Sequence, residues 1–91
     1  MPKWVDRFRA ADGIKAGELS STIRAFAECN LNVKQTARRL ALHTNTVYFR
    51  LNRIRELTGV DPRSFSGASL LLTTLRLIEA RTNGDGGHGG G

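Results

Sequence analysis

Six basic side chains lie within a stretch of the chain that contains no acidic residue. Between Glu28 and Glu56 every charged side chain is Lys or Arg. A solvated helix face usually carries both signs of charge, so a long block of one sign indicates a polyanionic partner. Side chains of these types bind phosphate oxygens, and Asn, Arg and Thr also bind base edges in the DNA major groove. The chemistry that this stretch predicts is nucleic-acid binding. Its basic residues are Lys34, Arg38, Arg39, Arg50, Arg53 and Arg55.

Two short helices joined by a tight turn are expected to hold these side chains. Asn32 and Gln35 have N-cap and N3 spacing, which predicts that the first helix begins at Asn32. The residues at 41–43 form the turn, in which position 41 favours a positive φ and carries Ala where Gly is common. The second helix is expected at 44–57, where Gly59 would end it. This layout is that of a helix-turn-helix, in which one helix lies in the major groove and the other supports it.

The side of the helix at 44–57 that faces away from its apolar seam is available to DNA. In a helix-turn-helix the N-terminal half of the second helix enters the groove. The expected base-contacting residues are Thr44, Asn45, Thr46, Tyr48, Phe49 and Arg50. The expected phosphate-contacting residues are Lys34, Gln35, Arg38, His43, Arg53 and Arg55.

Several of these residues also have a structural interpretation. Asn45 has the alternative of serving only as a helix cap, and His43 at the turn is expected either to cap or to contact phosphate. Arg53 has the alternative of a surface ion pair with Glu56. Phe49 either stacks against sugars and base edges or is covered by a later helix or a partner, and we favour the second.

The flanking segments complete an all-α fold, a small helical bundle of four to five helices. Apolar spacing predicts helices at 3–11, which Gly13 would end, at 17–29 and at 68–81. With 91 residues the chain is at most one compact domain. We divide it into a short helix and linker at 1–15, the helix-turn-helix domain at 16–81 and a disordered Gly-rich tail at 82–91.

The helix expected at 68–81 is more apolar than a single core requires. Surplus apolar surface of this kind usually marks an interface, which predicts a homodimer. A competing explanation is that Trp4 and Phe8 fold back and cover this helix within one chain. The expected dimer-interface residues are Leu70, Leu72 and Leu77.

Other classes of protein are disfavoured by composition. The single cysteine, Cys29, excludes an internal disulfide, and one Cys with two His gives no metal-ligand cluster. We see no nucleophile with a base, no paired carboxylates and no phosphate-binding loop, so we expect no enzyme activity and no cofactor. No apolar stretch is long enough to span a bilayer, and the N-terminus does not resemble a signal peptide. The expected location is the cytoplasm, without a membrane partner.

The segment TARRLALHTNTVYFRLNRIRELTGVD resembles the C-terminal DNA-binding domain of PucR/CdaR-type bacterial transcriptional regulators. The similarity runs from about residue 19 to residue 78, and the fold is also similar to the helix-turn-helix of the nucleoid protein Fis. In PucR/CdaR-type regulators this domain is the output end of a longer protein with an N-terminal sensor. The positions that carry the resemblance are Thr36, Ala37, Leu40, His43, Asn45, Thr46, Phe49, Arg50, Leu51, Arg53, Ile54, Leu57, Thr58 and Gly59.

The resemblance implies sequence-specific binding of double-stranded DNA in transcription control. This chain has no room for a sensor, so it is either an excised output domain or a short stand-alone protein. Two alternatives remain open at this point. One is a helical module that binds a protein partner through the helix at 68–81. The other is a nonspecific architectural DNA-binding protein like Fis, which would prefer bendable or A·T-rich DNA.

Overall fold

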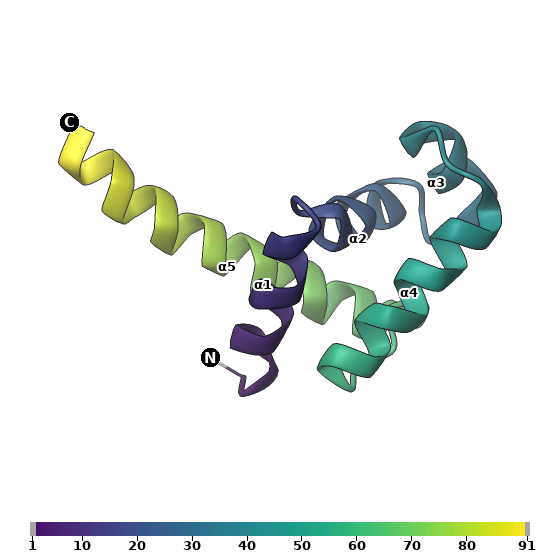
Figure 1. Cartoon of the computed structure of the whole chain (residues 1–91), viewed down its shortest axis with the longest axis horizontal. Coiled ribbons are helices and arrows are strands. Elements are labelled where there is room, and N and C mark those ends of the chain that lie inside the picture. The colour runs from purple at the N-terminus through teal and green to yellow at the C-terminus, as the bar shows by residue number, and fades with distance from the viewer. Residues whose placement is uncertain (1, 91) are drawn as a thin grey trace.

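The protein is all-α, as the sequence predicted. The computed structural model describes the backbone of residues 2–90 and the side chains of residues 2–81, and in this part it contains five helices and no strand (Figure 1). The helices are α1 (Trp4–Ile14), α2 (Glu18–Glu28), α3 (Val33–Leu40), α4 (Thr44–Thr58) and α5 (Phe65–Gly90). The predicted division of the chain into segments, with a disordered tail at 82–91, stays a prediction.

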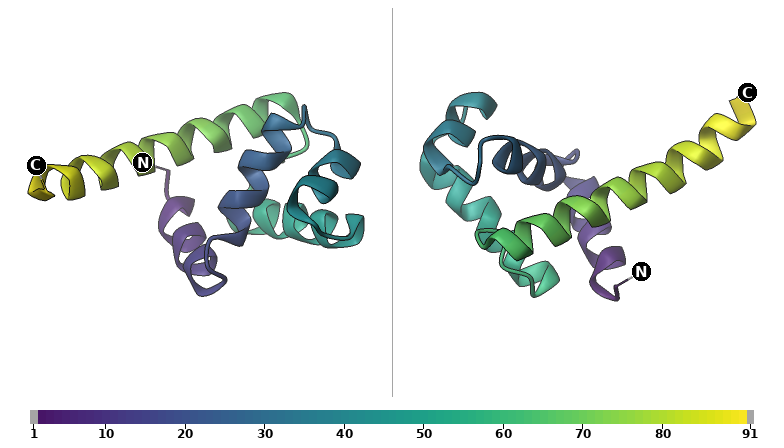
Figure 2. Two further views of the ribbon diagram at one scale, coloured as in Figure 1. Left: turned by 90° about the horizontal axis from the view of Figure 1, so that it is seen from above. Right: turned by 180° about the vertical axis from the view of Figure 1, so that it is seen from behind.

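Helix α2 is the central element of the fold. It contacts each of the other four helices and lies between α5 on one side and α4 on the other (Figure 2). Its apolar side chains Leu19, Ile23 and Phe26 are buried in a core to which the other helices also contribute. Because α2 touches both α3 and α4, it fixes the helix-turn-helix against the rest of the molecule.

The N-terminal helix belongs to this core. Phe8 is buried and packs in the same cluster as Leu71 and Leu75 of α5, while Trp4 meets Phe8 edge-on at 6.1 Å between ring centroids. Phe8 therefore folds back into the monomer. It does not cover the outer flank of α5, because Leu70 and Leu77 remain 48% and 54% exposed.

The end of α1 differs from the prediction. Gly13 does not end the helix, which continues to Ile14, and the chain reverses at two left-handed residues, Ala16 (φ 55°) and Gly17 (φ 78°). The physical reason is the side chain of Asp12, whose Oδ1 accepts from the amides of Leu19 (2.7 Å) and Ser20 (3.2 Å). This carboxylate belongs to α1 and caps the N-terminus of α2. The chain therefore reverses after Asp12, so that the first amides of α2 come back to this side chain.

Helix α5 begins earlier than the predicted residue 68. It starts at Phe65, because the hydroxyl of Ser64 accepts from the amide of Gly67 at 3.0 Å and serves as the cap. The preceding turn is held by Asp61, whose Oδ1 accepts from the amide of Arg63 at 3.0 Å. This turn leads directly into the long helix.

We expect Ala41→Gly to raise the free energy of unfolding by about 0.5–1 kcal/mol. Ala41 follows α3 with φ 56° and ψ 44°, a left-handed conformation that costs a residue with a Cβ about 1 kcal/mol and costs Gly little. Urea denaturation followed by circular dichroism would measure the change. The matched control is Ala10→Gly on the exposed side of α1, which should destabilise by about the same amount. Destabilisation by both changes would contradict the assignment of strain to position 41.

Candidate nucleic-acid interface

Helices α3 and α4 and the turn between them form the predicted helix-turn-helix. Asn32 caps α3, since its Oδ1 accepts from the amide of Gln35 at 2.9 Å. Ala37 is buried, and on α4 the buried side chains of Val47 and Leu51 belong to the same core cluster. A small residue at position 37 lets the two helices approach each other closely, as the spacing of the motif requires.

His43 caps the N-terminus of α4. Its Nδ1 accepts from the amide of Asn45 at 3.1 Å, which leaves Nε2 as the protonated nitrogen. The helix cap is therefore His43 and not Asn45, whose exposed side chain forms no hydrogen bond with any described residue. The Nε2–H group is free to donate to a phosphate oxygen, so capping and phosphate contact are compatible at this residue.

The exposed face of α4 presents amide and aromatic side chains. Asn45, Tyr48 and Phe49 are exposed, whereas Thr44 and Thr46 are half-buried. Asn52 is also exposed and lies two turns after Asn45 on the same face, although it was not among the predicted base-contacting residues. Phe49 is not covered by a later helix of the described chain, because its side chain is 69% exposed, and its cover by a partner stays a prediction.

Arg50 points into the protein. Its Nη2 lies 3.1 Å from Oε2 of Glu18 on α2, and its Nη1 lies 3.4 Å from the hydroxyl of Thr22. The side chains of Arg50 and Glu18 are 16% and 32% exposed, so this is a half-buried ion pair. Arg50 would have to leave Glu18 before it contacted a base, in contrast to the free side chains of the exposed face.

The predicted phosphate-contacting side chains lie on both helices and are exposed. Within the described residues, no ion pair includes Lys34, Arg38 or Arg55. Arg53 lies 3.8 Å from Glu56 on the same helix, which is the surface pair that the sequence offered as an alternative. At 3.8 Å and with both side chains exposed, such a pair is weak and leaves Arg53 available to another anion.

Arg63 is a basic residue near α4 that sequence reasoning missed. It lies in the turn before α5, and its guanidinium carbon is 5.1 Å from the centroid of the Tyr48 ring. This stacking places a further positive charge beside the exposed face of α4. The position of Arg63 beside Tyr48 depends on tertiary packing, which the sequence does not reveal.

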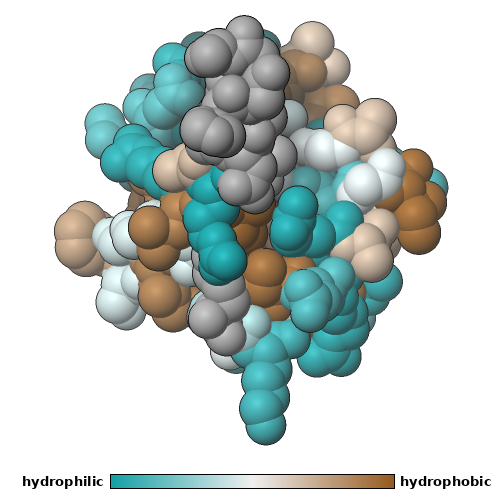
Figure 3. Space-filling view, turned by 90° about the vertical axis from the view of Figure 1, so that its left-hand side faces the viewer, coloured by the Kyte–Doolittle hydropathy of each residue, from teal (hydrophilic) through white to brown (hydrophobic). Residues whose placement is uncertain are grey.

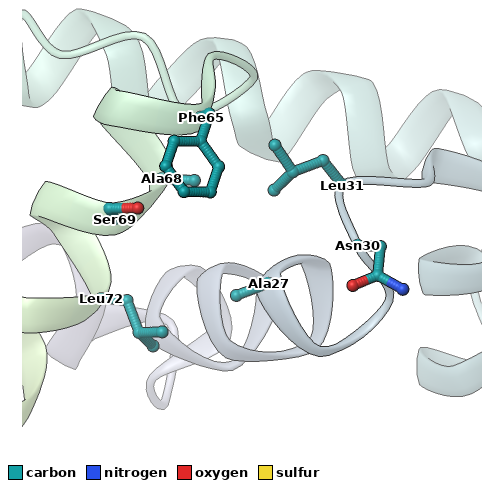
Figure 4. Close-up of a pocket in the computed structure, with 7 residues that line it drawn as sticks. All are labelled: Ala27, Asn30, Leu31, Phe65, Ala68, Ser69 and Leu72. Atoms are coloured by element: carbon teal, nitrogen blue, oxygen red, sulfur yellow. The ribbon is translucent and has the colours of Figure 1, made fainter.

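The predicted dimer-interface residues lie on two different flanks of α5. Leu70 and Leu77 are seven residues apart and share one flank, whereas Leu72 is about 200° around the helix from Leu70. Leu72 lines a groove of about 320 Å³, in which Phe65 and Leu31 lie opposite Ala27 (Figure 4). On the face that Figure 3 shows, hydrophobic areas are likewise separated by hydrophilic side chains.

The part of the chain that the structure describes holds no group of three or more His, Cys, Asp or Glu side chains placed to bind a metal ion. None of its helices is long and apolar enough to cross a membrane.

Known proteins resemble the chain over the same region. The family described as the PucR C-terminal helix-turn-helix domain matches residues 19–77. The carbohydrate diacid regulator of Escherichia coli K12 is 42% identical over 65 residues, which are 71% of this chain and 17% of that protein. The purine catabolism regulatory protein of Bacillus subtilis is 36% identical over 63 residues, which are 66% of this chain and 12% of that protein.

An uncharacterised Bacillus subtilis protein, YxkF, is 43% identical over 53 residues, which are 58% of this chain. The chain spans less than a fifth of the length of these relatives. No solved structure matches it significantly. Because the family match covers well over half of the sequence and includes α3, the turn and α4, this chain belongs to the PucR C-terminal helix-turn-helix domain family.

Proposed function

We propose that the protein binds double-stranded DNA sequence-specifically, as the output domain of a bacterial transcription regulator in the cytoplasm. The observation that carries this proposal is the exposed face of α4. It carries the exposed amide side chains of Asn45 and Asn52. Exposed basic side chains that form no ion pair among the described residues lie on the same two helices, namely Lys34 and Arg38 on α3 and Arg55 on α4. Amides pair with adenine in the major groove, and flanking Lys and Arg bind phosphates.

The residues divide into three roles under this proposal. Arg50 is a positioning residue, because its half-buried pair with Glu18 holds α4 against α2. The proposed base-contacting residues are Thr44, Asn45, Thr46, Tyr48, Phe49 and Asn52. The proposed phosphate-contacting residues are Lys34, Gln35, Arg38, His43, Arg53, Arg55 and Arg63.

We propose that two copies bind a two-fold-related site. Exposed Leu70 and Leu77 form one apolar flank of α5, and pairing of this flank with its copy would remove it from water. The two recognition helices would then contact half-sites about one DNA turn, or ~34 Å, apart. A monodisperse monomer at high micromolar concentration in light scattering would exclude a stable dimer in the absence of DNA.

The relatives support a place for the domain within a larger regulator. They are several times longer than this chain, and two of them carry regulator in their descriptions. A sensor domain on the N-terminal side of such a regulator is part of this proposal.

Amide NMR of labelled protein tests the proposal directly. We would add a mixed-sequence duplex at two salt concentrations and expect shifts in the residues of α3, the turn and the exposed face of α4. The shifts should weaken at the higher salt concentration, because phosphate contacts release counterions. Unchanged spectra in this region at low salt would refute DNA binding, and failure of a random duplex pool to yield an enriched sequence would indicate a Fis-like nonspecific protein instead.

The groove beside Phe65 supports a second candidate, a helical module that binds a protein partner. Phe65 is 81% exposed and lines this groove with Leu31 and Leu72 (Figure 4). This alternative predicts that DNA causes no shifts near physiological salt. Shifts on addition of a partner would then be confined to these groove residues and the flanks of α5.

A further inference from the structure

The Phe49 side chain is unlike the other apolar side chains of α4. Val47, Leu51 and Ile54 are buried in the core, whereas Phe49 is 69% exposed on the opposite face of the same helix. Within the described residues it neither supports the core nor lies under α5. A phenyl ring of this size in water is unfavourable unless a partner covers it, so its position calls for an apolar contact in the bound state.

A second exposed apolar side chain lies beside Phe49. Ile14, at the end of α1, is 81% exposed, and it lines a groove of about 330 Å³ with Phe49, Ala11 and Arg53. We call Ile14 and Phe49 the Phe49 patch. The patch therefore joins the edge of the recognition helix to α1, which lies outside the region matched by the family.

The surroundings of the patch indicate which partner covers it. Asn45 and Asn52 lie on the same face of α4. The charged residues that border the groove are Lys15, Arg53 and Glu18, of which Glu18 is paired with Arg50. A groove in a protein partner that bound this surface would have to accept amides and a guanidinium around one aromatic ring. The DNA major groove offers acceptors for these polar groups, phosphates for the guanidinium and a single kind of apolar group, the C5-methyl of a pyrimidine.

We propose that Phe49 contacts the C5-methyl group of a pyrimidine in the major groove and makes that methyl a determinant of sequence preference. This inference rests on the proposed DNA-binding function and adds the chemical group that is recognised. Every thymine carries this methyl group, and 5-methylcytosine carries the same group at the same ring position. Both sources are compatible with the contact, and the experiment below separates them.

The test begins with selection of a bound duplex from a random-sequence pool by the full chain. The selected duplex is then synthesised with uracil in place of each thymine in turn, which removes only the methyl group. A second series replaces each cytosine by 5-methylcytosine, which adds one. Affinity is measured by fluorescence anisotropy for the original chain and for Phe49→Ala.

Each half-site should contain one thymine whose replacement by uracil matters. Replacing that single thymine is expected to weaken binding about fourfold, the change that corresponds to the loss of one buried methyl group. With Phe49→Ala the original duplex should bind more weakly, and the uracil duplex should show no further loss. A gain with 5-methylcytosine instead, without any uracil effect, would assign the contact to methylated cytosine. The matched control is Phe65→Ala, which removes an exposed ring that is not on α4 and should keep the full uracil effect.

The outcomes separate this inference from the proposed function. If no duplex is enriched from the pool, sequence-specific DNA binding itself is refuted. If a duplex is enriched but neither methyl series changes the affinity, or if Phe49→Ala keeps the same uracil effect as the original chain, the methyl contact is refuted and DNA binding is retained. Because Phe49 is exposed, its replacement should leave the thermal unfolding transition unchanged, and this is checked by circular dichroism.

Discussion

Raising the salt concentration from about 50 mM to about 200 mM is expected to weaken specific DNA binding by the proposed dimer about 10³- to 10⁵-fold. Seven proposed phosphate-contacting side chains lie in each chain, and we expect three to five of them to bind phosphates simultaneously. Each contact releases a condensed counterion, so a plot of log affinity against log salt should have a slope on the order of −5 to −9. Fluorescence anisotropy titrations at four or more salt concentrations would measure it.

Arg38 and Arg39 provide a matched pair for this measurement. They are adjacent and exposed on α3, but Arg39 lies 3.2 Å from Glu28, whereas no described acidic residue pairs with Arg38. Arg38→Ala should reduce the magnitude of the slope by about one for each subunit, and it should weaken binding to all sequences alike. Arg39→Ala should change the slope less. A slope flatter than about −2, or equal effects of the two changes, would refute the proposed phosphate surface.

Arg50→Ala is expected to lower the free energy of unfolding by about 1–3 kcal/mol. The change removes one member of a half-buried ion pair and leaves Glu18 without its partner, which costs more than the loss of a surface pair. Urea denaturation would measure the loss. Arg53→Ala is the control, because its pair with Glu56 is exposed and long, and it should cost no more than about 0.5 kcal/mol.

DNA binding by the same variants distinguishes positioning from base contact. If Arg50 positions α4, replacing Glu18 by Gln should weaken specific binding as well, and the combined change should cost less than the sum of the two. If Arg50 instead leaves Glu18 and contacts a base, Glu18→Gln would free the guanidinium and specific binding would hold or improve. Unchanged stability of Arg50→Ala with a loss of base preference would support base contact and exclude the positioning role.

The helix-turn-helix was predictable because its signals are local. The cap at Asn32, the left-handed residues at 41 and 59 and the buried positions of α4 depend on neighbours within a few residues. The cap of α2 was not predictable in this way, because the Asp12 carboxylate that accepts from its amides lies on a different helix. For this reason the sequence predicted that Gly13 ends α1, whereas the helix continues to Ile14 and the chain reverses at Ala16 and Gly17.

The candidate site was predictable in its exposed residues and less so in its internal ones. Helical periodicity separates the core of α4 from its exposed face. The same periodicity places Leu70 and Leu72 on different flanks of α5. It could not show that Arg50 reaches Glu18 or that Arg63 returns to Tyr48, since both contacts join distant parts of the chain. Which charged side chain is free and which is engaged is decided by tertiary structure.

Phe8 and the carboxylate of Asp12 have a consequence for how the domain is delimited. The family match begins at residue 19, yet the buried core begins at Val5 and the cap of α2 is supplied from residue 12. A chain shortened to the matched region would lose this cap and uncover the side of the core on which Phe8 packs. The region that the family shares therefore begins at residue 19, whereas the part of the chain that packs as one unit begins well before that residue.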